Sequence, residues 1–296
     1  MREKNKLIIF ALLALFIIAF LLRLYRFDNP IADWHSWRQS ETSSVARIFV
    51  TEGFDLLHPQ MVNLSNVQSG LPNPQGYFFV EFPLATAAQA GLFVIFGVFT
   101  IEQWGRLVSI VASLFSGLFL YLLVSRHSNK SIGLWTTFFF LFIPFNIYYS
   151  RTILPEVPLV MAMLGAIYFF DQWIEKSKKY TLSDIQYWGW FFVALLFTAM
   201  AFLLKPYALF FTLPMMYLAY QAWGWKLITK WQVWLFTILA LSPLVAWRIW
   251  MTQFPEGIPA NLWLLNGNGI RFRPAFFRWM VYERLTILIS GYVGMV

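Results

Sequence analysis

Residues 7–22, LIIFALLALFIIAFLL, decide how this chain must fold. A helix that crosses a bilayer needs about 20 apolar residues, a length that this run approaches. A basic segment precedes the run, as in a signal peptide, but the residues that follow it, RLYRF (23–27), lack the small side chains of a cleavage site. We therefore interpret residues 7–22 as a retained first membrane span, a signal anchor.

The rest of the chain has the same apolar character. Its residues are 59% hydrophobic and 12% charged, whereas roughly 25% of the residues of a soluble domain are charged. The composition therefore predicts an all-α, polytopic membrane protein. Apolar segments that could cross the membrane lie at about 7–22, 80–99, 104–124, 131–149, 154–173, 187–204, 206–222, 231–250 and 281–296.

The segment at 80–99 differs from the others because Glu81 and Pro83 open it and Gln89 lies at its middle. If it dips into the membrane and returns, eight of the nine lysines lie on one side and Lys205 lies on the other. The positive-inside tendency favours that topology, although counting arginines as well leaves the two topologies nearly equal. We expect about eight spans and a re-entrant or interfacial helix in a single domain, 1–296. A long first extracytoplasmic loop, 23–79, is expected to carry interfacial helices.

Several classes of protein are disfavoured. The chain has no cysteine, and its three histidines show no HExxH or HxxxH spacing, which argues against a zinc enzyme. The net charge of +8 is spread over short loops between apolar runs, as expected beside anionic lipid, so we do not expect a nucleic-acid partner. The last segment, TILISGYVGMV, ends without a polar flank, and we expect either a truncated sequence or a final helix held by a partner.

Ionisable residues gather directly after the first span, in DNPIADWHSWRQSETSSVAR (28–47). Asp33, His35, Arg38, Glu41 and Arg47 lie within this stretch of a chain that rarely uses charge. Ionisable groups at a membrane edge indicate a functional site. Ser36 is expected to cap a short helix that runs to about Glu52 and carries Arg38 and Glu41 near one face. The alternative is a surface ion pair on an interfacial helix, which would contribute only a few tenths of a kcal/mol.

Four further charges stand alone beside apolar segments. Glu81 and Glu156 each lie next to a proline, and Arg151 precedes Glu156 in YYSRTILPE (148–156). Lys205 separates two apolar runs without a polar neighbour. Glu156 at the start of a helix is also explained by the helix dipole, and Lys205 by extension of its side chain to the lipid headgroups. Repetition of the carboxylate and proline pair, and the isolation of Lys205, favour a functional site.

The order of these motifs resembles the C-type membrane glycosyltransferases (GT-C), and within them glycosyltransferase family 39. That family includes protein O-mannosyltransferases and the bacterial aminoarabinose transferases. The matching segments are HSWRQSET (35–42), EFPL (81–84), GRL (105–107), SRTILPE (150–156) and LLKP (203–206). Each motif is short, and their order and placement carry the resemblance.

The resemblance implies transfer of a sugar from a polyprenyl-phosphate carrier in the membrane to an acceptor, with inversion, on the extracytoplasmic face of the plasma (inner) membrane. An acidic residue of the first loop would be the general base, and we favour Glu41 over Asp33. His35, Arg38, Glu81, Arg151, Glu156 and Lys205 would bind substrate, with cations neutralising the phosphate. No cofactor is indicated, and whether the reaction requires a divalent cation is left open. The alternatives are a secondary transporter and a non-catalytic subunit that binds the lipid carrier.

Overall fold

The computed structural model describes residues 2–32, 35–66, 68–179, 183–260 and 266–290, and its regular structure is helical, as predicted. Five segments are 3-10 or π helices, labelled η. In chain order the elements are α1 (Arg2–Arg23), α2 (Ser36–Glu52), α3 (Leu84–Phe96), α4 (Ile101–His127), α5 (Lys130–Phe142), α6 (Pro144–Tyr149), α7 (Glu156–Lys176), α8 (Ile185–Leu204), η1 (Pro206–Phe211), α9 (Thr212–Trp223), η2 (Gly224–Thr229), α10 (Trp231–Met251), η3 (Pro255–Gly257), η4 (Gly267–Phe272), α11 (Pro274–Arg278) and η5 (Trp279–Ser290).

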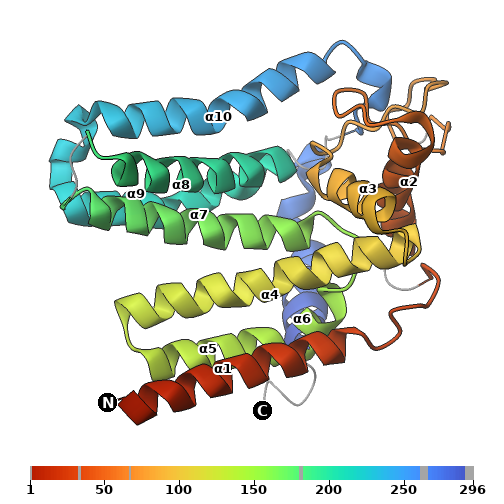
Figure 1. Cartoon of the computed structure of the whole chain (residues 1–296). Coiled ribbons are helices and arrows are strands. Elements are labelled where there is room, and N and C mark those ends of the chain that lie inside the picture. The colour runs from red at the N-terminus through yellow and green to blue at the C-terminus, as the bar shows by residue number, and fades with distance from the viewer. Residues whose placement is uncertain (1, 33–34, 67, 180–182, 261–265, 291–296) are drawn as a thin grey trace.

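The long helices lie side by side with similar directions and form a bundle (Figure 1). Among the described residues, α1, α4, α7, α8 and α10 are each long and apolar enough to cross a membrane. The shorter helices α5 and α9, of 13 and 12 residues, lie in the same bundle. The chain is therefore a multi-pass membrane protein.

Helix α3 occupies the segment that we expected to be re-entrant or interfacial. Its 13 residues extend for about 20 Å at the rise of an α-helix, whereas the hydrocarbon core is about 30 Å thick. Pro83 precedes the helix, and Gly97, with a φ of 62°, ends it in the left-handed conformation that suits glycine. Helix α3 is thus too short to cross, and it lies beside α2 at one end of the bundle (Figure 1).

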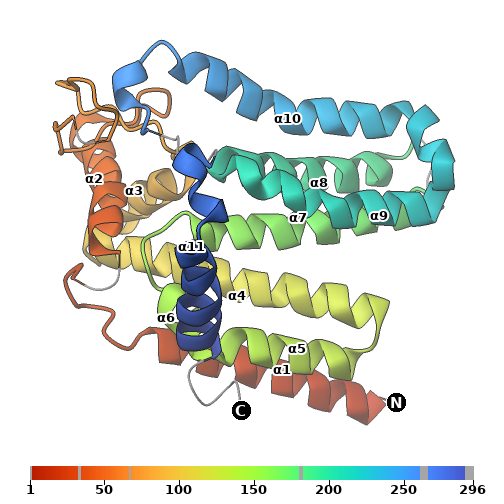
Figure 2. The ribbon, with the colours of Figure 1, turned by 180° about the vertical axis from the view of Figure 1, so that it is seen from behind.

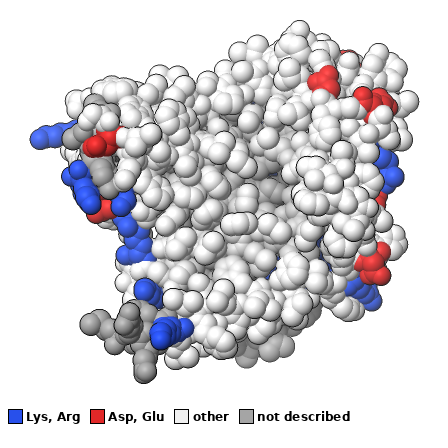
Figure 3. Space-filling model, viewed as in Figure 1, with Lys and Arg blue, Asp and Glu red and all other residues white. Residues whose placement is uncertain are grey.

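The lysines are divided unequally between the two ends of the bundle. Eight lysines lie in or next to the helix termini at the end where α1 begins, and Lys205 lies at the opposite end with α2 and α3. Figure 3 shows charged side chains at the two edges of the molecule and an uncharged surface between them. This partition of lysines is the one predicted. The eight are Lys4, Lys6, Lys130, Lys176, Lys178, Lys179, Lys226 and Lys230.

The final described segment differs from the expected lengthwise span at 281–296. Helix α11 continues into the π helix η5, and together they run across the bundle instead of along it (Figure 2). Glu283 and Arg284 lie in the middle of this segment. Because ionisable side chains are costly in the hydrocarbon core, a crossing path is disfavoured. Residues 291–296 lie outside the described residues.

Helices α7 and α8 pack closely at Gly165, which gives the first testable prediction. A Cβ atom there would clash with Cδ1 of Phe197, a ring that also packs against Phe119 and Phe169. Because the added Cβ would force this ring to shift against its neighbours, Gly165→Ala should lower the free energy of unfolding by about 1–3 kcal/mol. Gly189→Ala, which meets no atom within 4 Å, should leave it unchanged or raise it by roughly 0.5–1 kcal/mol. Denaturation of both variants in detergent checks this, and equal stabilities would contradict the packing.

Candidate functional site

Five ionisable side chains form a continuous chain of ion pairs at the Lys205 end of the bundle. Lys205 Nζ lies 3.3 Å from Glu156 Oε1 and 3.5 Å from Glu81 Oε2. Glu81 Oε1 accepts a hydrogen bond of 2.5 Å from Arg38 Nη2. Arg38 Nη1 lies 3.9 Å from Glu41 Oε2. The structure thus brings together five of the residues that the sequence singled out from four separate segments.

Local backbone features hold Lys205 and Glu81 next to each other. Helix α8 ends at Leu204 because Pro206 disfavours helical backbone at the residue before it, and Lys205 is extended with a φ of −154°. The backbone N–H of Phe82 donates to the carbonyl of Leu203 at 3.1 Å. This hydrogen bond ties the segment before α3 to the end of α8, so the two side chains meet.

Four of the five side chains are shielded from water. The Glu81 side chain is 9% exposed, and those of Arg38, Glu41 and Lys205 are similarly buried. Glu156, at the start of α7, is 49% exposed. Ion pairs gain strength when water is excluded, so Glu81 is bound most firmly and Glu156 most loosely. The Arg38 guanidinium also lies over the ring of Phe78, 4.8 Å from its centroid.

The two carboxylate oxygens of Glu41 differ in their hydrogen bonds. Gln68 Nε2 donates to Oε1 at 2.5 Å, whereas Oε2 is buried and has no hydrogen-bond partner among the described residues. Burial raises the pKa of Glu41, and the charge of Arg38 and the hydrogen bond from Gln68 partly oppose this rise. A carboxylate with a raised pKa and an oxygen that accepts no hydrogen bond is suited to accept a proton.

The other predicted site residues lie elsewhere. Asp33 falls outside the described residues. His35, and not the predicted Ser36, is the N-cap of α2; its φ is 59°, and its carbonyl accepts the N–H of Gln39 at 3.0 Å. Arg151 does not join the ion pairs, because its Nη1 donates to the carbonyl of Tyr25. The predicted role of Arg151 in substrate binding is therefore not supported by a contact with the ion-pair chain.

Two residues of the site escaped the sequence analysis. Gln68 lies in the first loop, where its backbone carbonyl accepts the N–H of Ala260 at 2.8 Å, and no sequence signal distinguished it. Arg248, half-buried in the last turn of α10, interacts electrostatically with Glu81. Arg248 is the single charge in the apolar run LVAWRIW (244–250), which is the same signal that indicated Lys205.

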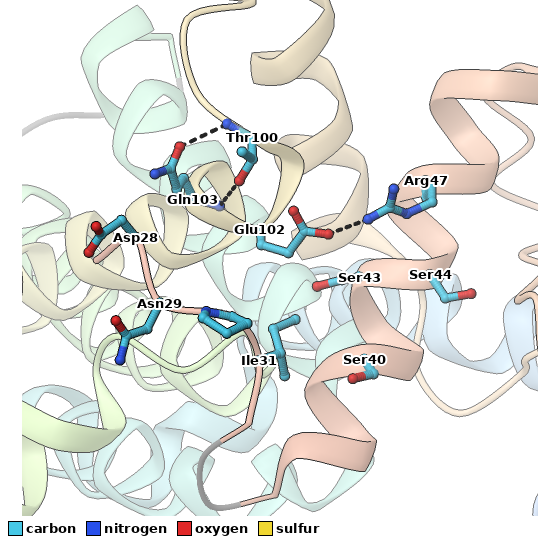
Figure 4. A pocket seen from close by; sticks show the side chains of 11 residues that line it. Asp28, Asn29, Ile31, Ser40, Ser43, Ser44, Arg47, Thr100, Glu102 and Gln103 are labelled. Carbon is cyan, nitrogen blue, oxygen red and sulfur yellow. Dashed lines mark hydrogen bonds and ion pairs between the residues drawn. The ribbon is translucent and has the colours of Figure 1, made fainter. Parts of the chain in front are cut away.

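A polar pocket of about 450 Å³ lies on another face of α2 (Figure 4). Arg47 of α2 and Glu102 of α4 form an ion pair at its edge, and the Thr100–Gln103 capping box begins α4 beside it. Ser40, Ser43 and Ser44 line the α2 side, and Ser44 Oγ accepts a hydrogen bond from the N–H of Val62 at 2.7 Å. This lining suits a polar, hydroxyl-bearing group. Among the described residues, no group of three or more His, Asp or Glu side chains is placed to hold a metal ion.

A bundle of apolar helices with a shielded ionic cluster at one end defines the class of this chain as a multi-pass membrane protein. The family model described as dolichyl-phosphate-mannose-protein mannosyltransferase matches residues 81–250, more than half of the chain. The chain therefore belongs to this family, and the predicted GT-C superfamily is confirmed. The matched region includes Glu81, Glu156, Lys205 and Arg248.

Two solved structures share the fold. ArnT from Cupriavidus metallidurans, bound to undecaprenyl phosphate, matches 90% of this chain with a TM-score of 0.58 and 14% identity. The archaeal oligosaccharyltransferase AglB from Archaeoglobus fulgidus, in complex with an inhibitory peptide and a dolichol-phosphate, matches 96% with a TM-score of 0.57 and 12% identity. The match spans 44% of the first protein and 34% of the second. No curated protein sequence matches the chain.

Proposed function

We propose that this chain is a membrane glycosyltransferase that moves a sugar from a polyprenyl-phosphate carrier to an acceptor hydroxyl, with inversion. The observation that carries the proposal is the ion-pair chain, in which the Glu41 carboxylate lies beside Arg38 and is linked through Arg38 and Glu81 to a second shielded cation, Lys205. Membership of the mannosyltransferase family supports it. The five side chains of the ion-pair chain lie at one end of the bundle, whereas the binding sites of secondary transporters lie near the bilayer midplane. This position favours a transferase over a transporter.

Each residue has a distinct role in the proposed reaction. Glu41 Oε2 takes the acceptor proton as the acceptor oxygen bonds to the anomeric carbon. The bond between that carbon and the phosphate oxygen breaks, and the electron pair leaves with the carrier phosphate. Lys205 and Arg38 stabilise the negative charge that develops there, and Glu81 orients both cations. Asp33, in the first loop, is the alternative base.

Charge balance indicates how the carrier phosphate enters. The ion-pair chain contains three carboxylates and two cations, and Arg248 adds a third cation near Glu81, so the cations are already balanced by carboxylates. We propose that a phosphate displaces one of these carboxylates. Glu156 is the most exposed acid, and its contact with Lys205 is 3.3 Å. In the proposed mechanism the phosphate takes the place of Glu156 on Lys205, while the buried Glu81 stays in position.

The position of the lysines supports an extracytoplasmic site. Eight lysines lie at the end of the bundle opposite to the ion-pair chain. Cytoplasmic loops of membrane proteins are enriched in basic residues, and we assign that end to the cytoplasm from the lysines, because arginines counted together with them leave the two topologies nearly equal. The ion-pair chain then faces the outer side of the plasma (inner) membrane, where a lipid-linked sugar donor and an acceptor would meet.

Replacing Lys205 tests the proposed binding of phosphate. Lys205→Gln removes one of the two cations and is expected to slow sugar transfer by roughly 10²–10³-fold, the effect of losing one transition-state donor. Transfer from labelled polyprenyl-phosphate sugars is measured in proteoliposomes with the full chain. Lys226→Gln, at the opposite end of the bundle, is the matched control and should transfer at the wild-type rate. A wild-type rate for Lys205→Gln would refute the role of Lys205.

A further inference from the structure

We propose that a second, basic pocket, at the end of α1, α4 and α6, binds the phosphate group of a membrane lipid. The pocket encloses about 280 Å³ and is lined by Arg26, Arg106, Arg151 and Tyr148, and its remaining described lining residues are uncharged. It shares no lining residue with the ion-pair chain. Three arginines around one small pocket make a field that attracts anions.

Arg106 of α4 forms one wall of the pocket and holds the segment that follows α1 in place through hydrogen bonds to its backbone. Its side chain is buried, and Nη1 donates to the carbonyls of Arg26, Phe27 and Asn29 at 3.3, 2.7 and 2.6 Å. Its Nη2 donates to the carbonyl of Pro30 at 3.4 Å. Carbonyl oxygens that faced the pocket would repel an anion. Because these hydrogen bonds orient the carbonyl oxygens towards Arg106, that repulsion is reduced.

Arg26 and Arg151 supply two cations to the pocket. Within the part of the chain that the structure describes, neither forms an ion pair with a carboxylate. The Arg151 guanidinium lies 5.3 Å from the ring of Tyr148 and 5.7 Å from that of Tyr25, while Arg26 lies 5.3 Å from the same Tyr25 ring. Two guanidinium groups beside one ring repel each other. A bound anion would remove this repulsion.

The backbone at Arg26 gives independent support. Arg26 has a φ of 56°, the left-handed conformation that a bulky residue rarely adopts. Residues held in this way gather at ligand-binding sites, where the surrounding contacts maintain them. The hydrogen bond from Arg106 to the Arg26 carbonyl is such a contact.

The location of the pocket indicates a lipid. It directly follows the membrane-spanning α1, and Tyr25 beside it is 65% exposed. Tyrosine and arginine side chains at this level of a membrane protein meet the lipid headgroups. The planar guanidinium group matches the geometry of phosphate oxygens and binds them in pairs, which favours a phosphate over other anions.

Native mass spectrometry of the full chain in neutral detergent tests the proposal by counting retained ligands. Separate arms add phosphatidylglycerol, undecaprenyl phosphate or inorganic phosphate. Wild type should retain phosphatidylglycerol, and the double variant Arg26→Gln/Arg151→Gln should retain it about tenfold less, because charge-assisted hydrogen bonds are lost. Arg47→Gln, which removes an exposed arginine at the same end of the bundle, is the matched control and should retain it as wild type does.

The arms distinguish the sources of the phosphate. A loss of undecaprenyl phosphate alone in the double variant would assign the pocket to the carrier, and a loss of inorganic phosphate alone would contradict a lipid ligand. Equal retention by wild type and double variant in every arm would overturn the proposal. If the double variant does not fold, Arg26→Gln alone, on an exposed side chain, tests the same prediction. Because the readout is binding, its outcome does not depend on sugar transfer at Glu41.

Discussion

Replacing Glu41 by glutamine is expected to reduce sugar transfer by roughly 10²–10⁴-fold, the usual contribution of a general base. Glutamine has the size of glutamate and accepts the hydrogen bond from Gln68, but it cannot take a proton from the acceptor. The measurement is transfer from a labelled polyprenyl-phosphate sugar in proteoliposomes. Asp33→Asn, measured in parallel, separates the two candidate bases, and full activity of Glu41→Gln would assign the base elsewhere.

The pH profile of transfer checks the same residue in a second way. A base works only when deprotonated, so the rate should fall as the pH falls through the pKa of Glu41, which burial raises. The hydrogen bond from Gln68 lowers this pKa, so Gln68→Leu should move the acidic limb to higher pH. Glu102→Gln, which alters a carboxylate outside the ion-pair chain, should leave the profile unchanged.

Stability should not follow activity in Glu41→Gln. Because the folded-state pKa of Glu41 is raised, protonation stabilises the fold, and this contribution is lost as the pH rises through that pKa. A glutamine at position 41 is neutral at every pH, so the variant does not lose this stabilisation as the pH rises. At neutral pH the variant is therefore expected to unfold at the wild-type temperature or above it, and a clear decrease would show that the ionised Glu41 supports the fold.

Glu81→Gln should give the largest loss of stability among the site variants. Glu81 is 9% exposed and lies between Arg38 and Lys205. Removing its charge leaves two shielded cations without their shared partner. Breaking a buried ion pair from one side costs about 3–5 kcal/mol, and we expect a decrease of this size in the free energy of unfolding. Denaturant titration in detergent measures it.

Two comparisons show whether the loss arises from unpaired charge. Glu102→Gln breaks the Arg47–Glu102 pair, in which Arg47 is 56% exposed, and should cost at most about 1 kcal/mol. The double variant Glu81→Gln/Lys205→Met removes one of the stranded cations and should be more stable than Glu81→Gln alone. Equal losses for Glu81→Gln and Glu102→Gln would mean that the buried ion pairs contribute no more than surface pairs.

Sequence patterns could predict the bundle and much of the site because both are marked by single charged or polar residues and prolines within long apolar segments. The prolines and polar residues around Glu81 indicated a helix that does not cross, and α3 is too short to do so. Lys205, Glu81 and Glu156 stood out as single charges, and the structure joins them through ion pairs. The lysine distribution likewise predicted which helix ends lie together.

Contacts between distant segments could not be predicted in this way. Arg151 lies close in sequence to Glu156, but its guanidinium turns towards the carbonyl of Tyr25, which is 126 residues away. Gln68 meets Glu41 only because the first loop folds back against the segment after α10. The path of η5 across the bundle depends on its packing against α6, a contact that its apolar composition does not specify.

The most direct test of the central claim is the position of the phosphate in a structure of the chain with a polyprenyl phosphate bound. We predict density for the phosphate within hydrogen-bond distance of Lys205 Nζ, on the side facing Glu41, with the contact between Lys205 and Glu156 broken. Phosphate density confined to the basic pocket at Arg26 and Arg151, or to the lysine-rich end of the bundle, would contradict the proposed donor site.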